Sequence, residues 1–225
     1  MGFVDTGAMR VVLGTEGHEA GAIYVVDSPE HPFALDVESL QLASAVVMVP
    51  VRDWDAALTP WPAKSPFRGR PDFGGEAKAT LSELLEALPA IEAAAGLAPK
   101  ARAICGYSLG GLFSLFALTH SDAFCACGCL SGSVWYEGWV DYLRDLEFDG
   151  RNAFAYFSVG TKEKRAAQPA IKRVEDDMRA CIEIMQAKGC VTEFATSPGG
   201  HMSDIDGRLA RGLQALDGAL SKLGC

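Results

Sequence analysis

Five consecutive residues, Gly106-Tyr107-Ser108-Leu109-Gly110, are the part of the chain whose types and spacing most directly indicate chemistry. An apolar run leads into them and a helix-compatible run leads out, a pattern that predicts a sharp turn from a strand into a helix. Such a turn exposes the serine hydroxyl at the carboxyl edge of a sheet, beside the unpaired N–H groups of a helix N-terminus. We expect a Cβ at position 106 or 110 to collide with the neighbouring strand or helix. The pentapeptide therefore predicts Ser108 as a nucleophile.

A serine hydroxyl needs a base within hydrogen-bond reach, and the chain contains four histidines. His201 directly follows the last predicted strand, in a segment SPGGHM whose two glycines allow the loop to fold over the strand ends. His18 and His31 lie in predicted loops, and His120 ends the helix that follows the turn. We therefore expect His201 to be the base and the other three histidines to have structural or surface roles.

A third group should orient the histidine, and in this chain order it should lie between the serine and the histidine. Glu163 follows the predicted strand at 153–159 and is the candidate. Basic residues at 162, 164 and 165 would keep its carboxylate ionised, or would make it an ordinary surface charge. The alternatives are a Ser/His pair without a carboxylate and three other acids, Asp141, Glu175 and Asp176.

An attack on a carbonyl group creates an oxyanion, which needs backbone N–H donors. We expect one donor from Leu109 and the other from Arg52 or Asp53, in the loop after the strand at 44–51. Aromatic residues at the same edge could either line a substrate pocket or anchor loops in the core. They are Trp54, Trp61, Tyr107, Trp135 and Tyr136.

The elements that must position these residues alternate between strands and helices. Apolar runs predict buried strands at 44–51, 123–130, 153–159 and 191–195. Apolar residues at helical spacing predict helices at 76–95, 171–188 and 205–220, with a partly helical segment at 135–146 and an ordered loop at 52–71. Residues 9–13 and 20–26 look like an antiparallel hairpin. This order predicts one α/β domain over 1–225, with a mainly parallel sheet, an N-terminal antiparallel hairpin, helices on both faces and no separate cap or recognition domain.

The composition argues against several classes of protein. A net charge of −9 without a basic stripe argues against nucleic-acid binding, and 49% hydrophobic residues suit a folded core. The first residues lack the pattern of a signal peptide and no apolar run reaches the length of a membrane span, so we expect a cytoplasmic protein without membrane partners. Cys125, Cys127 and Cys129 would share one face of a strand. Their spacing is not that of a zinc site, so we expect core residues and no metal.

Several motifs together resemble the putative-esterase family of α/β hydrolases, which includes enterobactin-esterase-like and esterase D-like proteins and, more distantly, mycolyltransferases. The motifs are GYSLGGLF at 106–113, SGSVWY at 131–136, GTKE ending at Glu163 and PGGH at 198–201. Residues 52–61 are similar to the family's R…D-L-T-P loop, with Ala57 where an acid is usual. The resemblance covers residue 20 to the end and implies the α/β-hydrolase fold. The short N-terminal region and the absence of a basic loop cluster favour a general carboxylic ester over a siderophore.

The leading hypothesis is a serine hydrolase that cleaves a carboxylic ester through an acyl-enzyme intermediate. It needs no metal or organic cofactor, and its partner is a small-molecule ester. An acyltransferase that uses the same Ser/His site is one alternative, because the acceptor that takes the acyl group cannot be read from the residues. A non-catalytic, hydrolase-like binding protein is the other. A homodimer is compatible with the sequence.

Overall fold

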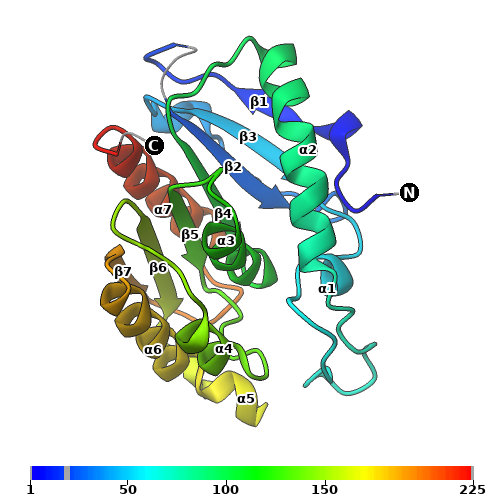
Figure 1. The fold of residues 1–225 in the computed structure, drawn as a ribbon. Helices are drawn as coiled ribbons and strands as arrows, with labels where there is room; N and C mark the ends of the chain where they lie inside the picture. The colour runs from blue at the N-terminus through cyan, green and yellow to red at the C-terminus, as the bar shows by residue number, and fades with distance from the viewer. Residues whose placement is uncertain (1, 18–20, 224–225) are drawn as a thin grey trace.

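The computed structural model describes residues 2–17 and 21–223, in which seven strands form one sheet in the order β1-β3-β2-β4-β5-β6-β7 (Figure 1). All neighbouring strands are parallel except β1, which is antiparallel to β3. The strands are β1 (Arg10–Val12), β2 (Ala22–Asp27), β3 (Ala45–Pro50), β4 (Arg102–Tyr107), β5 (Ala126–Leu130), β6 (Phe154–Gly160) and β7 (Val191–Ser197). The mainly parallel sheet that the sequence predicts is confirmed.

The predicted N-terminal hairpin is wrong in its strand pairing, although an antiparallel strand, β1, is present in this region. Arg10 of β1 lies opposite Met48 of β3, whereas Ala22 of β2 pairs in parallel with Ala45 of β3. Every residue of β2 is buried, so this strand belongs inside the sheet, between β3 and β4. The shorter and partly exposed β1 takes the edge. Residues 18–20, which include His18 and the start of the expected strand, lie outside the described residues.

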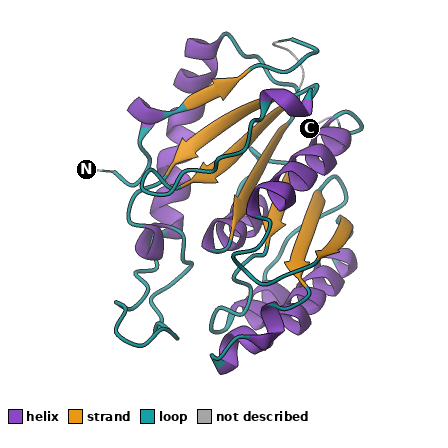
Figure 2. Cartoon of the chain, turned by 180° about the vertical axis from the view of Figure 1, so that it is seen from behind, coloured by secondary structure: helices purple, strands orange, loops and turns teal. Residues whose placement is uncertain are grey.

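Helices cover both faces of the sheet, as the alternating pattern predicts (Figure 2). The longer ones are α2 (Ala77–Ala95), α3 (Leu109–His120), α6 (Val174–Ala187) and α7 (Ile205–Leu220). The first three pack on one face and α7 packs on the other. The shorter helices are α1 (Trp54–Ala57), α4 (Trp139–Asp145) and α5 (Pro169–Lys172), with 3₁₀ turns η1 (Thr6–Ala8), η2 (Glu38–Leu40) and η3 (Glu163–Arg165). The helix predicted at 171–188 is divided into α5 and α6 at Arg173.

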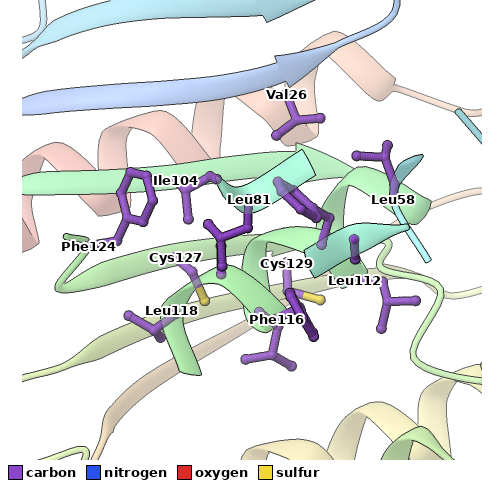
Figure 3. Packing of buried hydrophobic residues seen from close by; sticks show 14 of the residues in the cluster. Val26, Leu58, Leu81, Ile104, Leu112, Phe116, Leu118, Phe124, Cys127 and Cys129 are labelled. Atoms are coloured by element: carbon purple, nitrogen blue, oxygen red, sulfur yellow. The ribbon is translucent and has the colours of Figure 1, made fainter. Parts of the chain in front are cut away.

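The core on the α2–α3 face is built from side chains of both layers (Figure 3). Ile104 and Cys127 from the sheet and Leu112 from α3 are completely buried in it. Cys129 lies on this face as well, but Cys125 precedes β5 and belongs to the core on the α7 face. The three cysteines therefore do not share one face. No group of metal-ligating side chains among residues 2–17 and 21–223 could hold a metal ion.

The carboxyl ends of the parallel strands point toward the end of the molecule that carries α1, α4 and α5 (Figure 1). The chain passes from β2 to β3 on one side and then returns to place β4 on the other side of β2. Such a reversal opens a crevice at the carboxyl edge of an open sheet, where ligands bind. The turn with Ser108 follows β4, directly at this reversal. In the described part of the chain, no helix is long and apolar enough to cross a membrane.

Candidate active site

Ser108 occupies a strained turn between β4 and α3. Its backbone has φ 58° and ψ −119°, a conformation that is costly for a residue with a side chain. Its N–H donates to the carbonyl of Leu130 at 3.0 Å, and its own carbonyl accepts from Gly111 and Leu112 in the first turn of α3. A Cβ on Gly106 would lie 2.5 Å from the backbone of Gly110, so glycine is required there. The expected collision at position 110 is milder, because the nearest atom is Cη2 of Trp54 at 3.3 Å.

His201 lies in the loop between β7 and α7 and faces Ser108. Its Nε2 is 3.0 Å from Oγ of Ser108, and its Nδ1 is 2.8 Å from Oε2 of Glu163. Its backbone carbonyl accepts a hydrogen bond from the hydroxyl of Tyr107 at 2.5 Å. The imidazole is partly exposed, with 36% of its side-chain surface accessible, so it can meet both a buried carboxylate and a ligand in solution. The structure thus brings together the three residues that the chain order predicts.

Glu163 begins η3, shortly after the end of β6, and its side chain is almost completely buried. Burial alone would raise the pKa of this carboxyl, but His201, the N–H of Gly160 and the hydroxyl of Ser131 lower it below its ordinary value. Oε1 accepts from Gly160 at 2.7 Å and from Ser131 at 2.8 Å. The carboxylate is therefore ionised and held with Oε2 toward the imidazole.

The cation that pairs with Glu163 is Arg208 of α7, and not one of its basic neighbours in the sequence. Nη1 of Arg208 lies 2.8 Å from Oε1 of Glu163. Lys164 instead pairs with Glu175 on α6. Arg208 was missed by sequence reasoning, although it lies three residues after Ile205 on the apolar side of its helix. A lone charge on an apolar stripe is the signal that could have identified it.

The other candidate acids, and the histidines His31 and His120, lie elsewhere. Asp141 pairs with Arg144, and Glu175 pairs with Lys164 and Arg179. Asp176 lies in the first turn of α6 and has no described contact with His201. Nε2 of His120 is 2.6 Å from the Tyr142 hydroxyl, and Nδ1 is 2.7 Å from the carbonyl of Phe116. His31 is exposed in the loop after β2.

A cleft of about 430 Å³ opens over Ser108 and His201. Trp54 and Trp135 line it, together with Phe67, Phe73, Ile171 and the basic residues Lys162 and Arg165. Trp61 and Tyr136 do not line it, which corrects the expectation for them. Trp61 packs against Trp139 and Tyr142, and the Tyr136 hydroxyl donates to the Trp61 carbonyl. Both anchor loops because their rings have aromatic neighbours to bury against.

Tyr107 also differs from the expected pocket residue. Its side chain belongs to the core on the α7 face of the sheet and does not line the cleft. The alternation of side chains along β4 explains this, because the residue before the exposed serine points to the opposite face from the helix that follows. Its hydroxyl links Arg208 to the His201 carbonyl, as donor to the carbonyl and acceptor from the guanidinium at 2.8 Å.

The backbone N–H groups of Leu109 and Asp53 have no acceptor among the described residues. Leu109 is the first residue of α3 and lines the cleft. The N–H of Arg52 donates to the carbonyl of Phe3 at 2.9 Å, so Arg52 cannot serve an oxyanion. Asp53 precedes α1 with φ 53°, in the left-handed region that few residues adopt.

Ser133 is a second residue, after Arg208, whose place in the site was not predicted from the sequence, although it lies in the SGSVWY motif. Its Oγ lies 3.3 Å from Oγ of Ser108, and its N–H donates to the Ser108 carbonyl at 3.0 Å. It also lines the cleft. The motif SGSVWY at 131–136 was the available signal, because Ser131 contacts Glu163 and Ser133 contacts Ser108.

Fold and site together define an α/β hydrolase, with a serine, a histidine and a carboxylate gathered at the carboxyl edge of a parallel sheet. A family model described as "Putative esterase" matches residues 19–204 of the chain. The chain therefore belongs to the putative esterase family.

Individual proteins are similar to this chain in sequence or in fold. The uncharacterised protein YbbA of Bacillus subtilis (strain 168) is 32% identical over 135 residues, which are 58% of this chain and 54% of YbbA. The chain thus matches about half the length of that curated relative. Siderophore hydrolase EstA of Aspergillus nidulans superposes with a TM-score of 0.72 at 19% identity, over 96% of this chain and 97% of EstA. An IroE-like serine hydrolase of Shewanella oneidensis superposes with a TM-score of 0.75 at 18% identity, over 93% of this chain and 75% of the hydrolase. At these identities the two structures show the fold alone.

Proposed function

We propose that the esterase reaction of this chain is a serine hydrolysis of a carboxylic ester through an acyl-enzyme. Oγ of Ser108 attacks the ester carbonyl while Nε2 of His201 takes its proton. The tetrahedral intermediate collapses, the C–O bond to the alcohol breaks, and the imidazolium returns the proton to the leaving oxygen. Water then attacks the acyl group by the same proton route and releases the carboxylic acid.

The observation that carries the proposal is the continuous line of hydrogen bonds from nucleophile to carboxylate. The 3.0 Å contact between His201 and Ser108 allows proton transfer, and the 2.8 Å contact with Glu163 holds the imidazole in the tautomer that accepts at Nε2. Glu163 is buried and has a lowered pKa, so it stays negative and stabilises the imidazolium that forms.

For the oxyanion we propose the N–H groups of Leu109 and Asp53. Neither has an acceptor among the described residues, and the N-terminus of α3 adds the positive end of a helix dipole beside the first of them. The preorganised donors would meet the charge that develops on the carbonyl oxygen when Ser108 attacks.

For the substrate we propose a small carboxylic ester with an apolar portion. A cleft of about 430 Å³ lies at the lower end of the volumes that hold small ligands. Its aromatic wall, with Trp54, Phe73 and Trp135, favours apolar groups near the nucleophile. The structural neighbour EstA, whose name mentions a siderophore, shares the fold at 19% identity and does not define the substrate here.

The test is the hydrolysis of p-nitrophenyl acetate and butyrate by the wild type and Ser108→Ala, with labelling by a fluorophosphonate probe alongside. We expect labelling of the wild type at Ser108, and a loss in the variant of at least about 10³-fold in kcat. Ser203→Ala, in the same loop as His201 but without contact to Ser108, is the matched control and should retain activity. Equal turnover by wild type and Ser108→Ala would remove Ser108 as the nucleophile.

A further inference from the structure

Arg208 is a buried charged side chain that the proposed mechanism does not use directly. It lies in the first turn of α7, and its side chain is completely inaccessible to solvent. Removal of a guanidinium from water is costly unless its donors are satisfied and its charge is paired. Arg208 therefore needs hydrogen-bond acceptors and a negative partner, and the structure shows which groups supply them.

The guanidinium is connected to Glu163 and to the loop of His201 by three sets of hydrogen bonds. Nη1 donates to Oε1 of Glu163 at 2.8 Å, and Nη2 donates to the carbonyl of Gly200, next to His201, at 3.0 Å. Nη1 also reaches the hydroxyl of Tyr107 at 2.8 Å, and that hydroxyl donates to the carbonyl of His201. Ser131 and Ser197 accept from Nη1 and Nε at 2.7 Å and 2.6 Å.

These contacts constrain both ends of His201. Because Oε1 of Glu163 is occupied by Arg208, Ser131 and Gly160, the carboxylate is left with Oε2 for Nδ1 of the imidazole. The backbone of the same histidine is held through Tyr107 and Gly200. A planar guanidinium offers five N–H donors in a fixed fork, which a lysine ammonium cannot reproduce.

We propose that Arg208 is a positioning residue that sets the distance and orientation between His201 and Ser108, by holding the carboxylate of Glu163 and the loop of His201 at once. This inference rests on the proposed function, since positioning matters only if His201 acts on Ser108. Arg208 touches no reacting atom and acts through Glu163, Tyr107 and Gly200. A simple clamp between α7 and the sheet would instead contribute stability without altering the chemistry of the folded enzyme.

The charged and titratable groups around His201 define the expected pH effect. Glu163 contacts it from η3 and Tyr107 packs against it from β4, while Arg208 of α7 pairs with Glu163. Asp55, Lys162 and Arg165 line the same cleft. Asp204 at the start of α7 is paired with Arg211. Removal of the Arg208 charge leaves the Glu163 carboxylate uncompensated, which favours the protonated imidazole.

The experiment compares Arg208→Met and Arg208→Lys with Arg211→Met, an exposed arginine of the same helix. We expect Arg208→Met to lower kcat by about 100-fold, with KM within about threefold, because small misplacements of reacting groups have effects of this size. The acid limb of its kcat/KM profile should move up by about one pH unit. Arg208→Lys should recover part of kcat, and Arg211→Met should match the wild type.

A second pair of measurements keeps the test decisive if Arg208→Met does not fold. Tyr107→Phe keeps the buried ring but removes the hydroxyl that joins Arg208 to His201, and we expect its kcat to fall by about tenfold. In Arg208→Ala, guanidinium chloride at about 20 mM should restore part of kcat, by the same charge-assisted hydrogen bonds, whereas sodium chloride should not. All rates are divided by the active fraction from fluorophosphonate titration.

The inference is overturned if kcat per active site and the acid limb stay within about twofold of the wild type in the folded Arg208 and Tyr107 variants. A loss of kcat that disappears when the rate is divided by the active fraction also overturns the inference, because a purely stabilising contact between α7 and the sheet explains such a loss. Failure of the wild type to label at Ser108 would instead overturn the proposed function, so the two failures are distinguishable.

Discussion

Oγ of Ser133 lies 3.3 Å from Oγ of Ser108, so the proposed nucleophile has a second hydroxyl within reach in addition to the imidazole of His201. Ser133 is buried, and its N–H holds the Ser108 carbonyl. Its hydroxyl can accept from Ser108 in the free enzyme or donate to it when His201 has taken the proton. The second arrangement stabilises a developing alkoxide.

Replacement of Ser133 by alanine should therefore lower kcat/KM by about three- to tenfold, the effect of one hydrogen bond worth about 1 kcal/mol. Ser108 should still react with a fluorophosphonate, because His201 remains. The measurement is steady-state hydrolysis of p-nitrophenyl butyrate. A rate above that of the wild type would show that Ser133 competes with His201 for the Ser108 hydroxyl.

Glu163→Gln should lower kcat/KM by about 10³- to 10⁴-fold, because a glutamine amide can donate to Nδ1 and hold the imidazole in the wrong tautomer. The matched control is Glu175→Gln on α6, whose exposed partners are Lys164 and Arg179. It should change activity by less than about twofold, as expected for a surface pair. Comparable losses in both variants would argue against Glu163 as the orienting carboxylate.

Gly106→Ala and Gly110→Ala should differ sharply, although the two glycines flank the serine symmetrically. At 106 the new Cβ would meet the backbone of Gly110 at 2.5 Å, and we expect a loss of about 1–3 kcal/mol in unfolding free energy. At 110 the contact is the ring of Trp54 at 3.3 Å, so stability should change by less than about 1 kcal/mol. Urea denaturation of both variants checks this, and equal losses would contradict it.

Trp54→Ala and Trp61→Ala should separate binding from stability. Trp54 lines the cleft, so its removal should raise KM by about fivefold with little change in kcat. Trp61 instead packs on Trp139, Tyr136 and Tyr142, so its removal should cost about 2–4 kcal/mol of stability, since a large aromatic ring is lost. Steady-state kinetics and urea denaturation on both variants are the measurements. An unchanged KM in Trp54→Ala would exclude its ring from substrate binding.

Glu92 gives a pH-dependent contribution to stability far from the site. Burial alone would raise its pKa, but Arg102, at 2.5 and 2.8 Å, and the Tyr24 hydroxyl, at 2.6 Å, lower it. A lowered pKa adds stability that is complete above the pKa of unfolded glutamate, about 4.3, and is lost as pH falls through the folded value.

Glu92→Gln should therefore reduce the free energy of unfolding by about 1–3 kcal/mol at about pH 7, and by less at about pH 3. Urea denaturation at both values gives the difference, with the exposed Glu86→Gln of the same helix as control. A deficit that grows as the pH falls would contradict the sign of this linkage.

Local pattern predicted the elements of this chain well wherever burial was uniform. The apolar runs of β3 and β6 and the stripe of α7 appear where their periodicity places them. Local pattern did not predict which strands pair with each other. The strand at 10–12 is adjacent in sequence to β2, yet it pairs with β3, because the fully buried β2 needs a neighbour on each side. One apolar stripe at 171–188 also could not reveal the break at Arg173.

The sequence by itself determined which residues are candidates for the chemistry and their order along the chain. A strand, a glycine-flanked serine and a helix, then an acid and a histidine after later strands, place all three at one sheet edge, because parallel strands end at the same edge. Only the tertiary structure decided which polar groups hold them. Arg208, Tyr107 and Ser131 reach Glu163 and His201 from separate elements across the sheet. Such contacts depend on the relative placement of elements distant in sequence, which no local spacing encodes.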